Sequence, residues 1–170
     1  TDSALVTTKR TLIFNKLNRE LYRKFFMSRE ELQACNDGYI YVHDQSARRD
    51  TLNCCIFDVE NVLDGGFEMA NVWYNEPKSL DVAFDVMGDI IISSASMQYG
   101  GFTIPEVDKI VRKYAEISYN KYIDKYISLG LDESIAIEQA WKDVEKEMEQ
   151  GYQGWEYKFN TVSSSRGDYP

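Results

Sequence analysis

Apolar residues at helical spacing predict two helices in the N-terminal part of the chain. The longer one spans residues 4–26, where large apolar side chains recur at helical intervals: Leu5, Leu12, Leu17, Leu21 and Phe25. Ser28 with Glu31 has the capping-box pattern, in which each side chain bonds the other residue's main-chain N–H. The short helix that begins there is expected to end near Gly38, because glycine readily adopts the left-handed conformation that terminates helices.

Two short apolar runs follow that lack helical spacing. YIYV at 39–42 and LNCCIF at 52–57 are each predicted to form a β-strand, and the polar run QSARRD between them is predicted to form a turn. Residues 59–63 then fit a helical turn that ends at Gly65-Gly66. These two runs are the strands that the sequence predicts.

The remainder of the chain is predicted to hold three long helices, at about 79–98, 105–128 and 132–150. Gly100-Gly101 separates the first two helices, and Thr103 with Glu106 has the capping-box pattern for the second. Asp132 is expected to cap the third helix, after which the chain begins helical and ends as a loop. The chain is therefore expected to be mostly helical.

The charge of the chain argues against nucleic acid and against an anionic membrane as general partners. The formal net charge is −9, and the Lys and Arg residues are not clustered, whereas binding to polyanions needs clustered cations. No apolar run approaches the roughly 20 residues of a membrane span. Three cysteines, two of them adjacent, indicate reduced thiols and hence a cytoplasmic location or another reducing compartment.

The two adjacent cysteines carry the chemistry most open to interpretation. Neighbouring side chains of a strand point to opposite faces, so Asn53 and Cys55 should share one face and Cys54 should take the other. Both thiols could be small core residues. An asparagine beside them is easier to explain at the wall of a pocket, because its amide needs several hydrogen-bond partners.

His43 and Asp44 could suggest a metal site or a base with an orienting carboxylate. His43 is the only histidine of the chain, and the Glu-x-x-His and Cys-x-x-Cys patterns of zinc sites do not surround it. A histidine at a strand end, hydrogen-bonded to the following turn, is the favoured interpretation. No metal site is predicted in this chain.

The last two predicted long helices, at 105–128 and 132–150, have simple structural interpretations. Tyrosines recur along 105–128, at Tyr114, Tyr119, Tyr122 and Tyr126, and are expected to form a stripe that faces the core or another subunit. The charge-rich helix over 132–150 is expected to be solvated.

Short motifs in a fixed order carry a family resemblance from Leu12 to Pro170. They are GYIYVHD, NCCIFDVENVLDGGFEMAN, EPKSLDVAFDVMGDIIISSASMQYGG and WEYKFNTVSSSRG. In this order they resemble the anaerobic (class III) ribonucleoside-triphosphate reductases.

The resemblance implies an α/β fold, in which residues 1–170 are a single fragment from the N-terminal portion of a ten-stranded barrel of glycyl-radical type. The ATP cone, the finger loop and the glycyl-radical region would lie outside this fragment, as would the zinc site. The complete enzyme would reduce the 2′-hydroxyl of ribonucleotides with a glycyl radical, commonly with formate as reductant and with ATP or deoxynucleotides as effectors. A radical-SAM iron–sulfur activating enzyme and a second copy of the chain are the implied protein partners.

The same resemblance assigns site residues. Cys54 matches the cysteine on the substrate side of the ribose, where a thiol can give the departing 2′-hydroxyl a proton, and Asn53 would orient groups at the pocket edge. Lys78 and Lys121 fall where the family places effector contacts, and a lysine ammonium suits a phosphate. Asp89 stands where the family often has a glutamine, so the contact to the effector base is expected to differ.

Two other interpretations stay open at this point. A non-catalytic module that dimerises or binds nucleotide would explain why the downstream chemistry is missing, although the Asn53-Cys54 pair argues against it. Another glycyl-radical enzyme, such as a relative of formate lyases, is disfavoured by the order of the motifs. A fragment cut from a barrel should expose apolar surface, so self-association through residues 79–128 is expected.

Overall fold

A computed structural model describes residues 6–48, 52, 54–98 and 100–162 of the chain. The chain divides into two compact units. The described parts of the first unit lie within residues 6–55 and 92–102, and the second unit comprises residues 56–91 and 103–162. Each unit is described by itself below.

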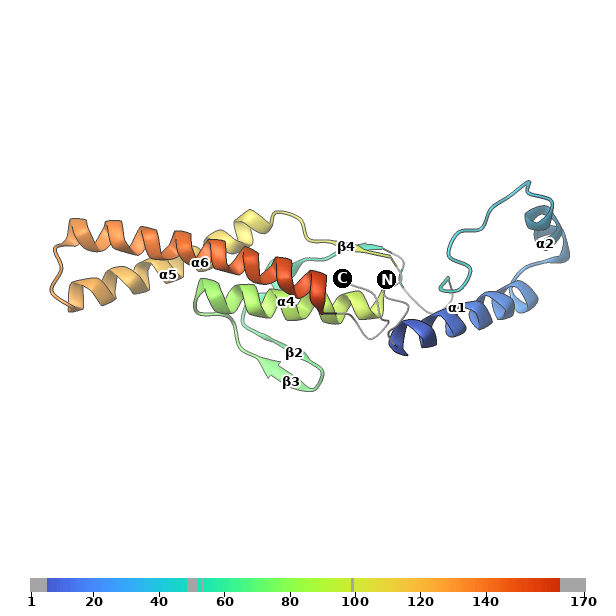
Figure 1. Cartoon of the computed structure of the whole chain (residues 1–170), viewed down its shortest axis with the longest axis horizontal. Coiled ribbons are helices and arrows are strands. Elements are labelled where there is room, and N and C mark those ends of the chain that lie inside the picture. The colour runs from blue at the N-terminus through green and yellow to red at the C-terminus, as the bar shows by residue number, and fades with distance from the viewer. Residues whose placement is uncertain (1–5, 49–51, 53, 99, 163–170) are drawn as a thin grey trace. The chain divides into compact units, whose positions relative to one another are not determined.

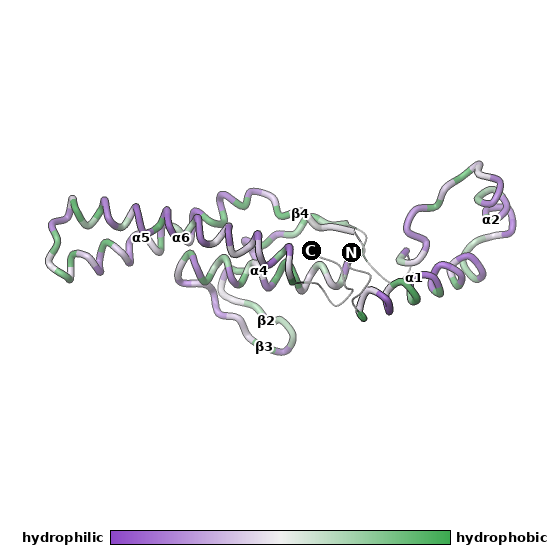
Figure 2. Tube along the Cα trace, in the orientation of Figure 1, coloured by the Kyte–Doolittle hydropathy of each residue, from purple (hydrophilic) through white to green (hydrophobic). Residues whose placement is uncertain are grey.

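The described residues are mostly helical, as the apolar spacing predicts (Figure 1). The elements are α1 (Val6–Phe25), α2 (Arg29–Asn36), β1 (Cys55–Ile56), α3 (Val59–Leu63), β2 (Phe67–Met69), β3 (Val72–Tyr74), α4 (Leu80–Met97), β4 (Phe102–Thr103), α5 (Val107–Ser128) and α6 (Glu133–Thr161). Apolar and polar positions alternate along the long helices, with the periodicity that lets a helix bury one face (Figure 2). Among these helices none is both long and apolar enough to cross a membrane.

The two predicted N-terminal helices are confirmed, including their boundary. The Ser28 hydroxyl accepts a hydrogen bond of 3.1 Å from the Glu31 N–H, and the Glu31 carboxylate accepts one of 2.8 Å from the Ser28 N–H. This reciprocal pair is the capping box that starts α2. Gly38, with a φ of 80°, ends α2, because the following Tyr39 N–H bonds back to the carbonyl of Ala34.

The predicted strand at 39–42 is wrong. Tyr39 and Tyr41 are 83% and 85% exposed, and residues 40–42 have no regular secondary structure. The main-chain N–H groups of Tyr39 and Ile40 both bond to the carbonyl of Ala34, so they are used at the helix end instead of in a strand ladder. An apolar run becomes a strand only where a partner strand can take its hydrogen bonds.

The predicted strand at 52–57 is correct in place but shorter than expected. It reduces to β1, Cys55–Ile56, which pairs with β4, and Leu52 forms an isolated parallel bridge with Gln98. Just after it, the Phe57 N–H donates a hydrogen bond of 2.9 Å to the carbonyl of Thr103. The partner of this strand is therefore a segment for which the sequence predicted no strand.

The hairpin of β2 and β3 was not predicted. Its strands pair antiparallel, with Phe67 opposite Tyr74 and Met69 opposite Val72. The two-residue turn holds Ala70 and Asn71, both with positive φ, which matches the twist of a tight hairpin. Because alanine is an unusual residue for such a turn, the usual Asn-Gly signal is absent.

The core of the second unit is formed by one face of each of its helices. Its buried residues come from α3, α4, α5 and α6: Val59, Leu63, Leu80, Ala83, Phe84, Val86, Met87, Ile90, Ile110, Val111, Tyr114 and Val144. The predicted turn at 59–63 is confirmed as α3, whose two apolar ends are both buried. Burial of these side chains provides the main free energy that holds the unit together.

Helices α5 and α6 lie side by side in this unit (Figure 1). The side of α6 that faces inward is lined by small residues at four-residue spacing, Ala136, Ala140 and Val144, so the solvated-helix prediction for 132–150 is wrong for this face. The hydroxyls of Tyr122 and Tyr126 donate hydrogen bonds to Glu147 and Asp143 on α6. The tyrosine stripe therefore serves contacts within the unit.

The starts of α5 and α6 differ from their predicted caps, and α6 is longer than expected. Glu106 is the cap residue of α5, with a φ of 52° and no side-chain cap bond, so the capping box from Thr103 is wrong. Asp132 does cap α6, but its side chain makes no cap bond. The helix was expected to reach about Gln150, with a helical start to the remainder, and it runs on to Thr161 through Gly151 and Gly154.

Candidate functional site

The structure brings the cysteine strand and the residue after α4 together. Gln98 directly follows α4, and it forms the parallel bridge with Leu52. Its side-chain nitrogen Nε2 donates a hydrogen bond of 3.0 Å to the sulfur of Cys55, which lies 43 residues earlier in the chain. Two of the motifs that carry the family resemblance therefore meet at one place in the first unit.

The two thiols differ in exposure, as alternation along a strand predicts. Cys55 is half-buried and faces Gln98, whereas Cys54 is exposed. Asn53 lies outside the described residues, so its predicted place beside Cys55 is not addressed. Among the described residues, Cys54 is thus the thiol of the pair that a ligand could approach.

Gln98 was not singled out by the sequence interpretation. Its side chain is only 6% exposed, and its carbonyl oxygen Oε1 is buried without a hydrogen-bond partner among the described residues. Gln98 stands three residues after Ala95, which the structure shows to be buried, and so continues a buried helix face. A polar residue at such a position needs a specific partner.

His43 and Asp44 form a local contact at the start of a turn, although the strand at whose end His43 was expected does not form. The Nδ1 atom of His43 contacts the Asp44 carboxylate, and the side chain of His43 is 69% exposed. Asp44 adopts a positive φ of 53° at the start of the turn that follows. Among the described residues, no group of three or more His, Cys, Asp or Glu side chains is close enough to hold a metal ion.

Lys78 and Lys121 lie near the same helix junction of the second unit. The Leu80 N–H at the start of α4 donates a buried hydrogen bond of 2.9 Å to the hydroxyl of Ser118 on α5. Lys78 stands two residues before Leu80, and Lys121 lies about one turn after Ser118; both side chains are exposed. Cationic side chains at such a junction are available to an anionic ligand.

Asp89 lies apart from this junction. It is nine residues beyond Leu80 on α4, a rise of about 14 Å along the helix. Its carboxylate pairs with the ammonium of Lys158 on α6 at 3.3 Å, and Lys158 also lies 3.8 Å from Asp85. The three predicted effector residues are therefore not gathered in one pocket of the described chain.

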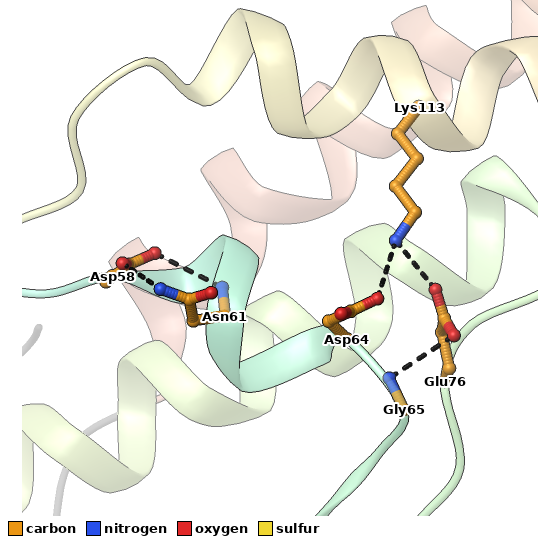
Figure 3. A network of polar contacts seen from close by, with 6 residues as sticks. All are labelled: Asp58, Asn61, Asp64, Gly65, Glu76 and Lys113. Atoms are coloured by element: carbon orange, nitrogen blue, oxygen red, sulfur yellow. Dashed lines mark hydrogen bonds and ion pairs between the residues drawn. The ribbon is translucent and has the colours of Figure 1, made fainter.

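A network around Lys113 has a structural role (Figure 3). The Lys113 ammonium on α5 lies 2.7 Å from the Glu76 carboxylate and 3.3 Å from that of Asp64, and Glu76 also accepts a hydrogen bond from the Gly65 N–H. The hydrogen bond from Lys113 lowers the pKa of Glu76, and the same bond raises the pKa of Lys113. Asp64 and Glu76 flank the β2–β3 hairpin, so the network fixes both ends of the hairpin to α5.

Comparisons with known proteins decide the family. The family model described as anaerobic ribonucleoside-triphosphate reductase matches residues 2–170. This chain belongs to the anaerobic ribonucleoside-triphosphate reductase family. The reductase of Enterobacteria phage T4 is 32% identical over 99% of this chain, and those of Haemophilus influenzae and Escherichia coli are each 30% identical over the same share.

The chain spans about a quarter of the length of these curated reductases: 28% of the phage protein and 24% of each of the two bacterial ones. Oxidoreductase chemistry is a property of the named relatives. The small sheets seen here are compatible with an α/β architecture. The ten-stranded barrel remains an expectation.

In this member of the reductase family, α5 and α6 also border an open groove of about 890 Å³. Its lining is apolar and aromatic at the centre, with Tyr119, Trp141, Val144, Met148 and Tyr152. Acidic residues of both helices also line the groove, at Asp108, Glu116, Glu145 and Glu149, whereas its one cation, Arg112, is paired with Glu116 at 2.8 Å. This charge disfavours a nucleotide triphosphate in the groove.

Proposed function

We propose that this chain forms the first part of the catalytic domain of an anaerobic ribonucleoside-triphosphate reductase, with Cys54 as the thiol on the substrate side of the ribose. The observation that carries the proposal is the exposure of Cys54 beside a Cys55 that is held by Gln98. The family match over residues 2–170 supports it. The domain would be the start of a ten-stranded α/β barrel.

The proposed chemistry of Cys54 is general acid catalysis. Reduction at C2′ of the ribose breaks the C2′–O bond, and the leaving hydroxyl departs as water if it receives a proton. The Cys54 thiol would donate that proton within hydrogen-bond reach, and the adjacent Asn53 would orient polar groups at the pocket edge. The exposure of the sulfur supports this role, since a buried thiol could not approach the substrate.

The remaining components would be supplied from outside this chain. A glycyl radical, generated by a radical-SAM activating enzyme, would start the reaction, and formate would provide the two electrons that replace the hydroxyl by hydrogen. The zinc site of the family would also lie elsewhere. None of these groups is assigned to a residue of this chain.

Effector control would involve the junction of α4 and α5. Lys78 and Lys121 are exposed near one junction, and each offers an ammonium suited to the phosphates of ATP or a deoxynucleotide. Asp89, paired with Lys158, would act at a distance from them and give this chain a base contact unlike that of a glutamine. A homodimer built on the helices of 79–128 would complete such a site.

A non-catalytic module that dimerises is the second candidate. One observation favours it: α1 leaves most of its large apolar side chains exposed, at Val6, Leu12, Ile13, Phe14, Leu17, Leu21 and Phe25. Such a surface normally contacts another element or another chain. Self-association would fit both candidates, so sedimentation does not distinguish them. Loss of nucleotide reduction when Cys54 is replaced does distinguish them.

The test is deoxyribonucleotide formation by the complete, activated reductase carrying Cys54→Ser or Cys55→Ser. Removal of a general acid typically costs on the order of 10²–10⁴ in rate, so Cys54→Ser should lose activity on that scale. Cys55→Ser is the matched control, because a serine hydroxyl can still accept the bond from Gln98, and it should stay within about threefold of the native rate. A Cys54→Ser protein that reduces nucleotides at the native rate would favour the non-catalytic module.

A further inference from the structure

The side-chain amide of Gln98 is buried and contacts the strand that holds Cys55, which lies far from Gln98 in the chain. Its Nε2 bonds the sulfur of Cys55 at 3.0 Å, and its backbone forms the parallel bridge with Leu52. Both contacts lie within the first unit. The segment that carries Cys54 is therefore held against Gln98 at two positions that flank it.

The oxygen end of the Gln98 amide lowers the stability of the folded chain. Oxygen Oε1 is buried and has no hydrogen-bond partner among the described residues. Rotating the amide by 180° would place the oxygen against the sulfur and leave the nitrogen without a partner, so one end is unsatisfied in either orientation. A methionine of similar length would fill the same space without this penalty. Stability alone does not explain a glutamine here.

We propose that Gln98 is a positioning residue that determines which of the two adjacent thiols faces outward. Cys54 directly precedes β1 and is exposed, so the hydrogen bond that holds Cys55 inward leaves Cys54 facing outward. A shift of the strand by one residue would exchange the two sulfurs, and the Leu52 bridge together with the Cys55 bond opposes that shift.

The inference rests on the proposed function, in which Cys54 must be the thiol that approaches the ribose. Its physical content concerns only the orientation of the two thiols. It can therefore be tested on this chain without any reductase activity. Failure of the orientation test and failure of the activity test for Cys54 are then separate results.

The test is alkylation by iodoacetamide, in which a thiolate sulfur displaces iodide, with each modified cysteine quantified by mass spectrometry. In the native chain Cys54 should react faster than Cys55 by about tenfold, since access controls thiol reactivity. In Gln98→Met this ratio should fall at least about threefold, because the constraint on Cys55 is lost. The melting temperature of Gln98→Met should be unchanged or higher.

Gln153→Met is the matched control, because Gln153 is an exposed glutamine on α6 whose amide bonds the hydroxyl of Tyr157. It should leave the ratio unchanged. An unchanged ratio in Gln98→Met would overturn the proposal. A changed ratio together with a lower melting temperature would also overturn it, since that pair of results describes a residue kept for stability.

A second pair of variants keeps the test decisive if Gln98→Met does not fold. Cys55→Ser retains an acceptor for the Gln98 amide, whereas Cys55→Ala removes it. Alkylation of Cys54 should stay within about twofold of the native rate in Cys55→Ser and change by at least about threefold in Cys55→Ala. Equal Cys54 rates in these two variants would overturn the proposal.

Discussion

The indole nitrogen of Trp155 donates a hydrogen bond of 2.7 Å to the main-chain carbonyl of Phe84, 71 residues earlier in the chain. The two aromatic rings also meet edge to face, with centroids 4.8 Å apart. This pair joins the last turns of α6 to the first turns of α4. It explains why α6 continues well past the position where its sequence pattern predicts an end.

The close approach at this crossing depends on Gly151. A Cβ atom at Gly151 would lie 2.3 Å from a ring carbon of Phe84, which is inside any allowed contact distance. Gly151→Ala should therefore lower the free energy of unfolding by about 1–3 kcal/mol, the usual cost of overpacking. Thermal or urea denaturation followed by circular dichroism measures it.

Gly154 provides the matched control on the same helix. A Cβ atom there would have no neighbour within 4 Å, so Gly154→Ala should raise the free energy of unfolding by about 0.5–1 kcal/mol through helix propensity. If both alanine variants were equally stable, the account of the α4–α6 crossing would be wrong.

The Lys113 network predicts a dependence of stability on pH. Pairing with Lys113 lowers the pKa of Glu76 below its ordinary value of 4.5, so this contribution is present above that value and is lost as the pH falls through the lower, folded-state pKa. The raised pKa of Lys113 means that its contribution is present at neutral pH and is lost only in strong alkali, above its ordinary value of 10.5.

The difference in melting temperature between the native chain and Lys113→Met should therefore be largest near neutral pH. It should shrink as the pH falls through the lowered pKa of Glu76, because protonation removes the charge that pairs with Lys113. Lys113 is partly exposed, so solvent screening keeps the effect below about 1 kcal/mol. Lys146 is an exposed lysine on α6, and Lys146→Met serves as control. A Lys113→Met difference that does not vary with pH would contradict the assignment.

The bond between Tyr122 and Glu147 predicts a second stability effect. Burial, followed by the hydrogen bond to the Glu147 carboxylate, raises the pKa of Tyr122, so the phenol stays neutral and donates. Tyr122→Phe removes this donor, so Glu147 loses its bond to the phenol. The other carboxylate oxygen of Glu147 is already buried without a partner among the described residues. The free energy of unfolding should fall by about 1–3 kcal/mol.

Chemical denaturation at neutral pH measures this loss, with Tyr126→Phe for comparison. Tyr126 makes the equivalent bond to Asp143 nearer to solvent, so its substitution should have the smaller effect. The opposite order of the two variants would refute the view that Glu147 depends on Tyr122.

Effector binding should depend on both lysines of the α4–α5 junction. Replacing Lys78 or Lys121 by methionine removes one ammonium that is free to contact a phosphate, and each change should weaken deoxynucleotide binding by about tenfold. Isothermal titration of the complete reductase with deoxynucleotides measures it. Lys142→Met is the control, because Lys142 is paired with Glu138 on α6; equal affinities in all three variants would reject the proposed effector site.

The parts of the fold set by local sequence could be predicted. The capping box of Ser28 and Glu31 and the left-handed Gly38 involve only neighbouring residues, and both appear as expected. The hairpin turn at Ala70-Asn71 could not be predicted, because the positive φ of an alanine is imposed by the pairing of the strands around it.

Of the candidate site, only the different orientation of the two adjacent thiols could be predicted from the sequence. Alternation along a short strand sufficed to separate Cys54 from Cys55. Gln98 could not be assigned, since its importance comes from contact with a residue 43 positions away. In the same way the length of α6 depends on the contact of Gly151 with Phe84, which no local pattern contains.

The central claim is that Cys54, and not Cys55, faces the ribose of the substrate. The most direct measurement is the alkylation rate of each thiol in the complete reductase, with and without a saturating ribonucleoside triphosphate. Bound substrate should slow the alkylation of Cys54 by about tenfold or more and leave Cys55 unaffected, and inorganic triphosphate should protect neither. Equal protection of both thiols, or of Cys55 alone, would contradict the account.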